Sequence, residues 1–172
     1  MSTPDLQTLL DRAAISDVVH AYATGLDRRD WSLYRSIFTD QLEMDYASIG
    51  IAPGTFDADK WVRASKRLFL GFSATQHTSS NHVHTIRGDE ATCISNMQAE
   101  HFIAPEPGRD ADERELRWTI GGYYENELVR TPDGWKLCGV ALRITWQHGN
   151  REVPNVAMRL GRARLKAEEA PA

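Results

Sequence analysis

The chain has 172 residues, of which 41% are hydrophobic and 26% are charged, proportions that are ordinary for one globular domain with its own core. Its 20 Lys and Arg against 24 Asp and Glu leave a formal net charge of -4. No basic stripe alternates with aromatic residues, so we expect no nucleic-acid partner.

The ends of the chain and its cysteines exclude further classes. The polar start, Met1–Asp5, leads into an amphipathic segment rather than an apolar run, so we expect no signal peptide, no membrane anchor and a cytoplasmic location. Cys93 and Cys138 lie far apart and show neither paired metal-site spacing nor the density of a disulfide scaffold. We expect both to be buried thiols.

The first half of the chain carries helical periodicity. Apolar residues recur at three- and four-residue steps in the first segment, and Asp30 and Asp57 are suitable caps for the next two. A weak strand signal over 43–49 ends before the turn at Pro53 and Gly54. The predicted helices span residues 6–26, 31–38 and 57–70.

From residue 75 onward the hydrophobic period changes to two, which predicts strands. Short turns at Arg87–Asp89 and Thr131–Gly134 join these strands into two hairpins. Residues 1–150 are expected to form the single domain, and residues 151–172 a C-terminal tail or short helix. The four long strands are predicted over residues 75–86, 90–103, 114–130 and 135–146.

This order of elements predicts an α+β domain, because no βαβ unit calls for a parallel sheet. Three helices on one face of a strongly bent antiparallel sheet would enclose a cone-shaped cavity. Such cavities host small apolar ligands.

Asp27 and His77 are the candidate chemical pair. Asp27 continues the inward face of the first helix although it is charged, and a carboxylate in that position needs a partner. His77 opens a strand and can face the same cavity. On spacing alone, however, Asp27 is equally well explained as a surface cap or ion-pair partner, and His77 as a satisfied core or surface group.

A metal site is the alternative for the histidines, since imidazoles are common zinc and iron ligands. Strand parity opposes it, because His82 and His84 are expected on the face opposite to His77. We therefore expect a solvated strand face and no metal. The histidines concerned are His77, His82, His84 and His101.

The chain resembles the SnoaL-like proteins of the NTF2-like superfamily over about residues 5–146. Within that superfamily it is most similar to the branch of scytalone dehydratase, bile acid 7α-dehydratase and hexachlorocyclohexane dehydrochlorinase. The runs that carry the resemblance are Arg12–Asp17, Tyr22–Asp27, Gln76–Asn81, Gly88–Ala91, Gly121–Tyr124 and Asp133–Leu137.

The resemblance implies a cone-shaped NTF2-like fold and roles for individual residues. Asp27 and His77 match an acid that orients a histidine base in β-elimination. Tyr22 matches a pocket tyrosine of the bile acid enzyme, Tyr46 a second pocket tyrosine, and His101 falls near a second histidine of scytalone dehydratase. Bulky apolar side chains are expected to complete the pocket, among them Phe38, Met97 and Trp118.

The function implied is that of a cofactor-independent dehydratase-type lyase, with Tyr22, Asp27 and His77 as catalytic residues. Its substrate would be a hydrophobic polycyclic or aromatic molecule such as a steroid or polyketide. The alternatives are a ketosteroid-isomerase-like enzyme and a non-catalytic subunit like those of aromatic-ring dioxygenases. An apolar outer sheet face around Trp146 predicts a homodimer or homotrimer.

Overall fold

We describe a computed structural model of the chain for residues 4–105, 112 and 116–168. Its helices are α1 (Leu6–Arg28), α2 (Trp31–Ser36), the short 3₁₀ helix η1 (Ala47–Ile49), α3 (Ala58–Phe69) and α4 (Val153–Glu168). Its strands are β1 (Phe38–Tyr46), β2 (Ile51–Asp57), β3 (Ala74–Arg87), β4 (Glu90–Phe102), β5 (Arg117–Thr131) and β6 (Gly134–Gly149). Among the described residues, no helix has the length and apolar character needed to cross a bilayer.

One six-stranded sheet holds the domain together, in the order β2-β1-β6-β5-β4-β3. The expected α+β fold with a strongly bent sheet is confirmed. The sheet is mixed rather than purely antiparallel, because β1 runs parallel to β6. The sheet does not close on itself, and β2 and β3 form its edges.

Strand β2 was not predicted. Pro53 and Gly54 indicated a turn, yet both lie within the strand. Proline is tolerated there because β2 is an edge strand and Pro53 lies in a register shift between the pairs of Gly54 and Ile51, where it pairs with no residue of β1. The predicted start of the third long strand, at Arg114, lies outside the described residues.

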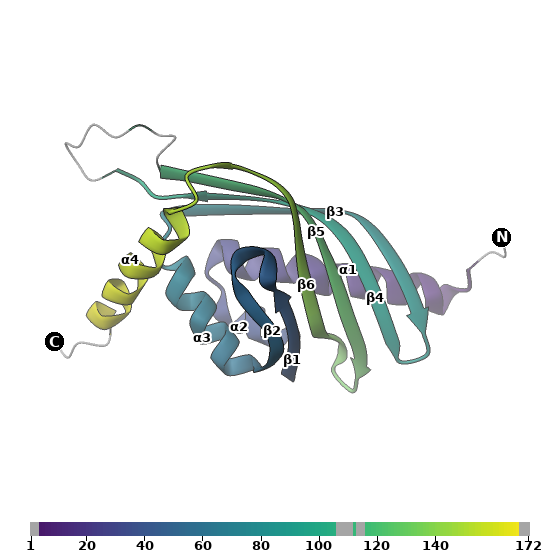
Figure 1. Cartoon of the computed structure of the whole chain (residues 1–172). Coiled ribbons are helices and arrows are strands. Elements are labelled where there is room, and N and C mark those ends of the chain that lie inside the picture. Colours follow the sequence, from purple (N-terminus) through teal and green to yellow (C-terminus); the bar gives the residue numbers. More distant parts are fainter. Residues whose placement is uncertain (1–3, 106–111, 113–115, 169–172) are drawn as a thin grey trace.

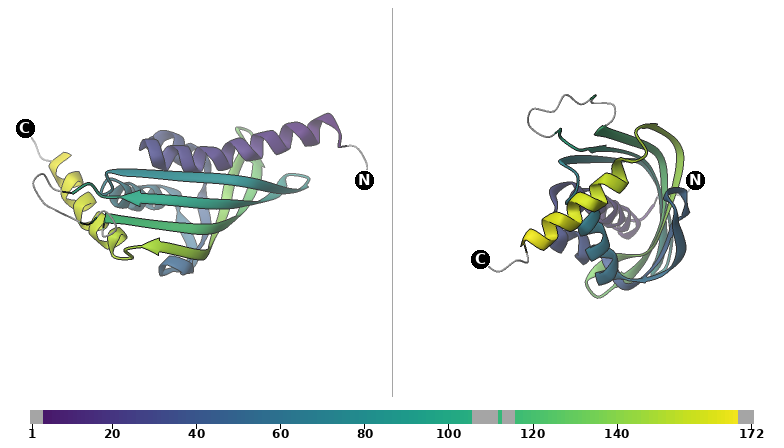
Figure 2. Two further views of the ribbon diagram at one scale, coloured as in Figure 1. Left: turned by 90° about the horizontal axis from the view of Figure 1, so that it is seen from above. Right: turned by 60° about the vertical axis from the view of Figure 1, so that its left-hand side comes forward.

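The sheet wraps around α1, as the two views of Figure 2 show. A register shift between Gly121 and Gly122 interrupts the pairing of β5 with β6 near the middle of β5. A Cβ at Gly121 would lie 2.1 Å from the ring of Trp146, so a larger residue cannot occupy this position without displacing that ring. The buried face of α1, with Ile15, Val19 and Leu26, packs into the concave side.

Strand β3 contains a bulge that reverses its side-chain alternation. Ser80 pairs with Asn96 and Val83 with Ile94, so β3 has one extra residue, and Asn81 has a φ of 54°. The bulge turns His82 and His84 to the face that His77 shares, beneath α1. The parity prediction that separated these histidines is therefore wrong, as is the expectation of a solvated strand face.

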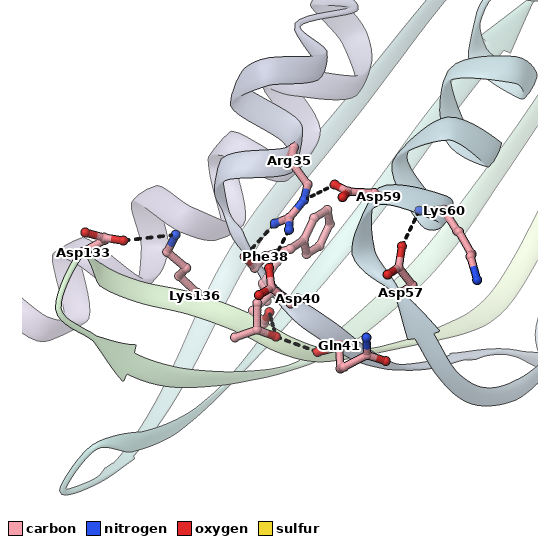
Figure 3. A network of polar contacts seen from close by, with 11 residues as sticks. Arg35, Phe38, Asp40, Gln41, Asp57, Asp59, Lys60, Asp133 and Lys136 are labelled. Atoms are coloured by element: carbon pink, nitrogen blue, oxygen red, sulfur yellow. Dashed lines mark hydrogen bonds and ion pairs between the residues drawn. The ribbon is translucent and has the colours of Figure 1, made fainter.

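Charged side chains tie α2 to β1 and α3 (Figure 3). The guanidinium of Arg35 in α2 contacts Asp40 of β1 at 2.7 Å and Asp59 of α3 at 2.6 Å. Asp57 caps α3 by accepting a hydrogen bond from the backbone N–H of Lys60 at 2.9 Å. These contacts hold three elements around one end of the concave side.

Residues 153–168 form a full helix, α4, beside α3 (Figure 1). The two helices approach backbone to backbone: a Cβ at Gly71 would lie 1.7 Å from the carbonyl oxygen of Ala157, and one at Gly161 would lie 1.8 Å from that of Arg67. Val153 and Ala157 are buried. The predicted division into a domain over 1–150 and a C-terminal segment over 151–172 stays a prediction, and residues 169–172 lie outside the described part.

Candidate active site

The end of α1 and the start of β3 bring Asp27 and His77 into contact. The carboxylate Oδ1 of Asp27 lies 2.7 Å from His77 Nδ1, and Oδ2 accepts a hydrogen bond from the His77 backbone N–H at 2.6 Å. One carboxylate thus holds both the ring and the main chain of the histidine. The His77 side chain is 6% exposed and that of Asp27 is 20% exposed.

Thr75 contacts the Asp27 carboxylate, and Arg29 contacts Thr75. The Thr75 hydroxyl donates to Asp27 Oδ1 at 2.9 Å and accepts from the Arg29 guanidinium at 2.8 Å. Arg29 follows the helix in a left-handed conformation, φ 58°, and its guanidinium lies over the ring of Phe69, 5.4 Å from the centroid. The Asp27 carboxylate is therefore held in one orientation by Thr75 and His77 of β3, and Arg29 in turn holds Thr75.

The environment keeps Asp27 ionised. Burial by itself would raise its pKa, but the hydrogen bonds and electrostatic attraction of the His77 ring and backbone N–H, with the hydrogen bond from Thr75, outweigh burial and lower the pKa below its ordinary value. A carboxylate facing Nδ1 favours the tautomer with hydrogen on Nδ1. The unprotonated Nε2 is then free to act as a base.

An apolar cavity of about 150 Å³ lies beside His77. Its walls come from α1, α2, β1, η1, β2, α3, β3 to β6 and α4, so every helix and strand named above contributes to it. The lining residues are Tyr22, Leu26, Tyr34, Tyr46, Ile49, Ile51, Trp61, Ala64, Ser65, Leu68, Phe69, Phe72, His77, His101, Trp118, Ile120, Tyr124, Leu142 and Met158.

Four tyrosines supply hydroxyls to this cavity: Tyr22, Tyr34, Tyr46 and Tyr124. The hydroxyls of Tyr22 and Tyr46 are 2.5 Å apart, and the indole N–H of Trp61 donates to the Tyr34 hydroxyl at 3.1 Å. Burial, reinforced by the neighbouring tyrosines, raises the pKa of Tyr22 and Tyr46 well above the ordinary value. Both therefore remain neutral phenols, which are hydrogen-bond donors.

His101 is a second cavity imidazole, with its ring centroid 5.5 Å from that of His77. Burial, with a smaller contribution from His77, lowers the pKa of His101 to about 3, so the ring is neutral near pH 7. Its Nδ1 lies 3.1 Å from the backbone carbonyl oxygen of Trp118. Since a carbonyl only accepts, Nδ1 carries the hydrogen and Nε2 is an acceptor.

The structure places five of the predicted site residues besides Asp27 around one cavity: Tyr22, Tyr46, His77, His101 and Trp118. It does not place Phe38 and Met97 there. The ring of Phe38 lies behind those of Tyr22 and Tyr34, and Met97 lines a separate void of about 10 Å³.

Among the residues of the site that were not predicted from the sequence are Arg29, Tyr34, Thr75 and Tyr124. Thr75 could have been found, since it precedes His77 by two residues and strand alternation puts both on one face. Tyr34 and Tyr124 lie on apolar faces, where a tyrosine is indistinguishable from a core residue. Arg29 gives no such signal, because its direction depends on the left-handed backbone that ends α1.

Comparison with known proteins gives the family. The model of the SnoaL-like domain matches residues 7–141, and the chain belongs to that family. A crystal structure of a Kribbella flavida protein is 36% identical, covers 88% of this chain and 99% of its own, and superposes with a TM-score of 0.79.

Two further solved structures carry names of enzymes. A hexachlorocyclohexane dehydrochlorinase is 21% identical, covers 85% of this chain and 93% of its own, and has a TM-score of 0.70. A protein of Novosphingobium aromaticivorans provisionally named a scytalone dehydratase is 21% identical, with coverages of 83% and 93% and a TM-score of 0.68. At these identities both likenesses show the fold alone.

Proposed function

We propose that this protein is a cofactor-independent lyase that removes water or halide from a compact, cyclic, hydrophobic substrate. The observation that carries the proposal is the contact between Asp27 and His77 at the wall of an apolar cavity. An imidazole held by a carboxylate is a sufficient base for a carbon acid activated by a neighbouring carbonyl or a comparable group.

In the proposed mechanism Nε2 of His77 takes the proton from the activated carbon. The electrons of the broken C–H bond form the new C=C bond, and the bond to the leaving group breaks. Asp27 stabilises the imidazolium without taking its proton. When the leaving group is hydroxide, His77 returns the proton and water departs; a halide leaves without it.

Tyr22 and Tyr46 supply the stabilisation of negative charge in this mechanism. As neutral phenols in an apolar cavity they can donate hydrogen bonds to a carbonyl oxygen that becomes an enolate. One of the two hydroxyls donates to the other across 2.5 Å, so the accepting hydroxyl keeps its own hydrogen for the substrate oxygen and the other phenol strengthens that donor. His101, whose Nε2 accepts, is suited to a substrate hydroxyl instead.

The cavity volume limits the substrate to about one ring. A dry apolar cavity of this size, about 150 Å³, holds a molecule such as benzene, whereas sites for drug-sized ligands have roughly 300–1,000 Å³. A steroid would therefore require displacement of wall residues such as Ile49, Ile51 or Met158. We favour a monocyclic or small bicyclic substrate over a polycyclic one.

The names of the structural neighbours support the reaction class. A dehydrochlorinase and a provisionally named dehydratase share this fold, and both names denote elimination. Because their identity to this chain is low, the argument rests on Asp27, His77 and the tyrosines.

The test is a panel of cyclic β-hydroxyketones and chlorinated cyclohexanes incubated with the protein in D₂O. We expect an unsaturated product, deuterium at the acidic carbon of recovered substrate or ketone analogue, and loss of both with His77→Ala. The exposed His148 provides the matched control, His148→Ala. A moved double bond without a leaving group would indicate an isomerase, and saturable binding without exchange a non-catalytic binding module; either result contradicts the lyase.

A further inference from the structure

A second group of reactive side chains lies away from the cavity, beneath the N-terminal half of α1. It contains His82 and His84 of β3 and Cys93 of β4. One ligand atom from each, an imidazole nitrogen or the thiol sulfur, lies within 4.8 Å of the other two. None of the three lines the cavity beside His77.

The β3–β4 pairing brings these residues together. His84 and Cys93 are direct partners across the two strands, and their side chains share the face that α1 covers. His82 lies two residues before His84, so ordinary strand alternation puts both side chains on one face, and the bulge at Asn81 turns that face toward α1. Without that bulge, both histidines would lie on the face opposite to His77, away from α1.

The nitrogen atoms of His84 are unequally satisfied. Its Nε2 lies 2.9 Å from the Ser16 hydroxyl of α1, whereas its Nδ1 is buried and has no hydrogen-bond partner among the residues that the structure describes. Leaving a buried nitrogen without a partner is unfavourable, and such a group calls for a ligand. The unpartnered nitrogen belongs to the residue that faces Cys93.

Serine hydroxyls hold the other histidine. His82 Nδ1 lies 2.9 Å from the same Ser16 hydroxyl, and its Nε2 lies 2.9 Å from that of Ser79. Metal-binding imidazoles typically use the second nitrogen for such a contact, which fixes the ring. Ser16 thus orients both rings, and His82 needs to release only one rotatable hydroxyl to coordinate.

We propose that His82, His84 and Cys93 form a binding site for Zn²⁺, with water at the fourth position. Zinc is commonly bound by imidazole nitrogens and thiolate sulfurs, and two imidazoles with one thiolate form such a ligand set. Ligands about 2.0–2.3 Å from a tetrahedral zinc lie roughly 3.3–3.7 Å from one another. The three ligand atoms now lie within 4.8 Å of one another. To bind zinc they must approach by about 1 Å, which small side-chain rotations can provide.

The charges around the three ligands affect metal binding. Arg12 and His20 are the positive or potentially positive groups that act on the two histidines, and no acidic side chain is among the three ligands. Burial raises the pKa of the Cys93 thiol to about 11, so the metal must displace the thiol proton. The resulting thiolate supplies the negative charge that compensates the ion beside Arg12.

The proposed site is structural rather than part of the elimination, since bound zinc would link β3 to β4 beneath α1. It does not depend on the proposed function. The first test uses wild-type protein, freed of metal by chelation, and Co²⁺ as a spectroscopic substitute. We expect one equivalent to bind with a thiolate-to-cobalt charge-transfer band, which Zn²⁺ then abolishes.

Variants assign the ligands. Cys93→Ala should remove the band, whereas Cys138→Ala, at the other cysteine, should keep it. Ser16→Ala should weaken binding about 10-fold and His84→Ala more than about 100-fold, beyond the range of outer-shell changes. If folded wild-type protein shows no such band, or if Cys93→Ala keeps it, the proposal is wrong, and the wild-type result decides even if a variant fails to fold.

Discussion

Replacing Asp27 with Asn changes hydrogen bonding at His77 while keeping the shape of the side chain. The carboxylate accepts three hydrogen bonds, from the His77 backbone, the His77 ring and the Thr75 hydroxyl. An amide has only one oxygen for these donors. If that oxygen accepts the hydrogen bond from the fixed backbone N–H, the NH₂ group of Asn faces Nδ1 of His77. The ring must then carry its hydrogen on Nε2, and Nε2 can no longer act as the base.

The size of the effect follows from this change of tautomer. Losing positioned general-base catalysis costs about 10²–10⁴-fold in kcat/KM, which corresponds to roughly 2.7–5.5 kcal/mol at 1.36 kcal/mol for each tenfold change. The effect on folding is smaller. A hydrogen bond to a charged group contributes about 1.5–3 kcal/mol, and Asn retains part of the set, so we expect the melting temperature to fall by only about 2–8 °C.

The assay measures elimination and deuterium exchange for wild type and Asp27→Asn, with circular dichroism as the folding check. Proton NMR of His77 adds a readout of geometry, because the Nδ1–H signal facing the carboxylate should disappear in the variant. Thr75→Val is the graded control and should lose less than about tenfold. Full exchange activity in folded Asp27→Asn would refute the assignment of Asp27 as the orienting residue.

Three further changes test other parts of the structure. Tyr46→Phe removes a phenol donor from the cavity and should lower kcat about 10²–10³-fold with little change in melting temperature; unchanged kcat would exclude the proposed charge stabilisation. Gly25→Ala places a Cβ 2.9 Å from Tyr34 Cβ and should cost about 1–3 kcal/mol in denaturant unfolding, whereas a neutral result would show that α1 and α2 separate easily. Asp11→Asn should destabilise the fold at neutral pH, because the hydrogen bond from Arg130 lowers the pKa of Asp11 from 3.8. That contribution is fully present above the unfolded pKa and is lost progressively as the pH falls toward the lowered folded pKa, so the difference between the melting temperatures of variant and wild type should shrink steadily below about pH 4; a constant difference would contradict it.

The predicted homodimer or homotrimer stays a prediction. Trp146 is 48% exposed, and Val83 and Ile94 are exposed neighbours on paired strands. Light scattering of the purified protein measures the oligomeric state directly.

Much of the fold could be predicted from local patterns. The helical repeat of apolar residues in α1 and the two-residue alternation of apolar residues in β3 to β6 are properties of consecutive residues. The order of these elements along the chain indicates an α+β domain. β2 could not be predicted, because Pro53 and Gly54 are turn residues unless the strand lies at an edge. The parallel pairing of β1 with β6 was equally hidden, since it joins segments about 100 residues apart.

The candidate site, too, could be predicted only in part. The sequence by itself determined that Asp27 would sit at the end of a helix and His77 at the start of a strand, because helix and strand periods depend on neighbouring residues. Only the tertiary structure decided that the two side chains meet, that Phe38 and Met97 lie outside the cavity, and that one bulge at Asn81 moves His82 and His84 beneath α1. The physical reason is that these outcomes depend on packing between distant segments and on a single backbone conformation, φ 54° at Asn81, which local periodicity does not encode.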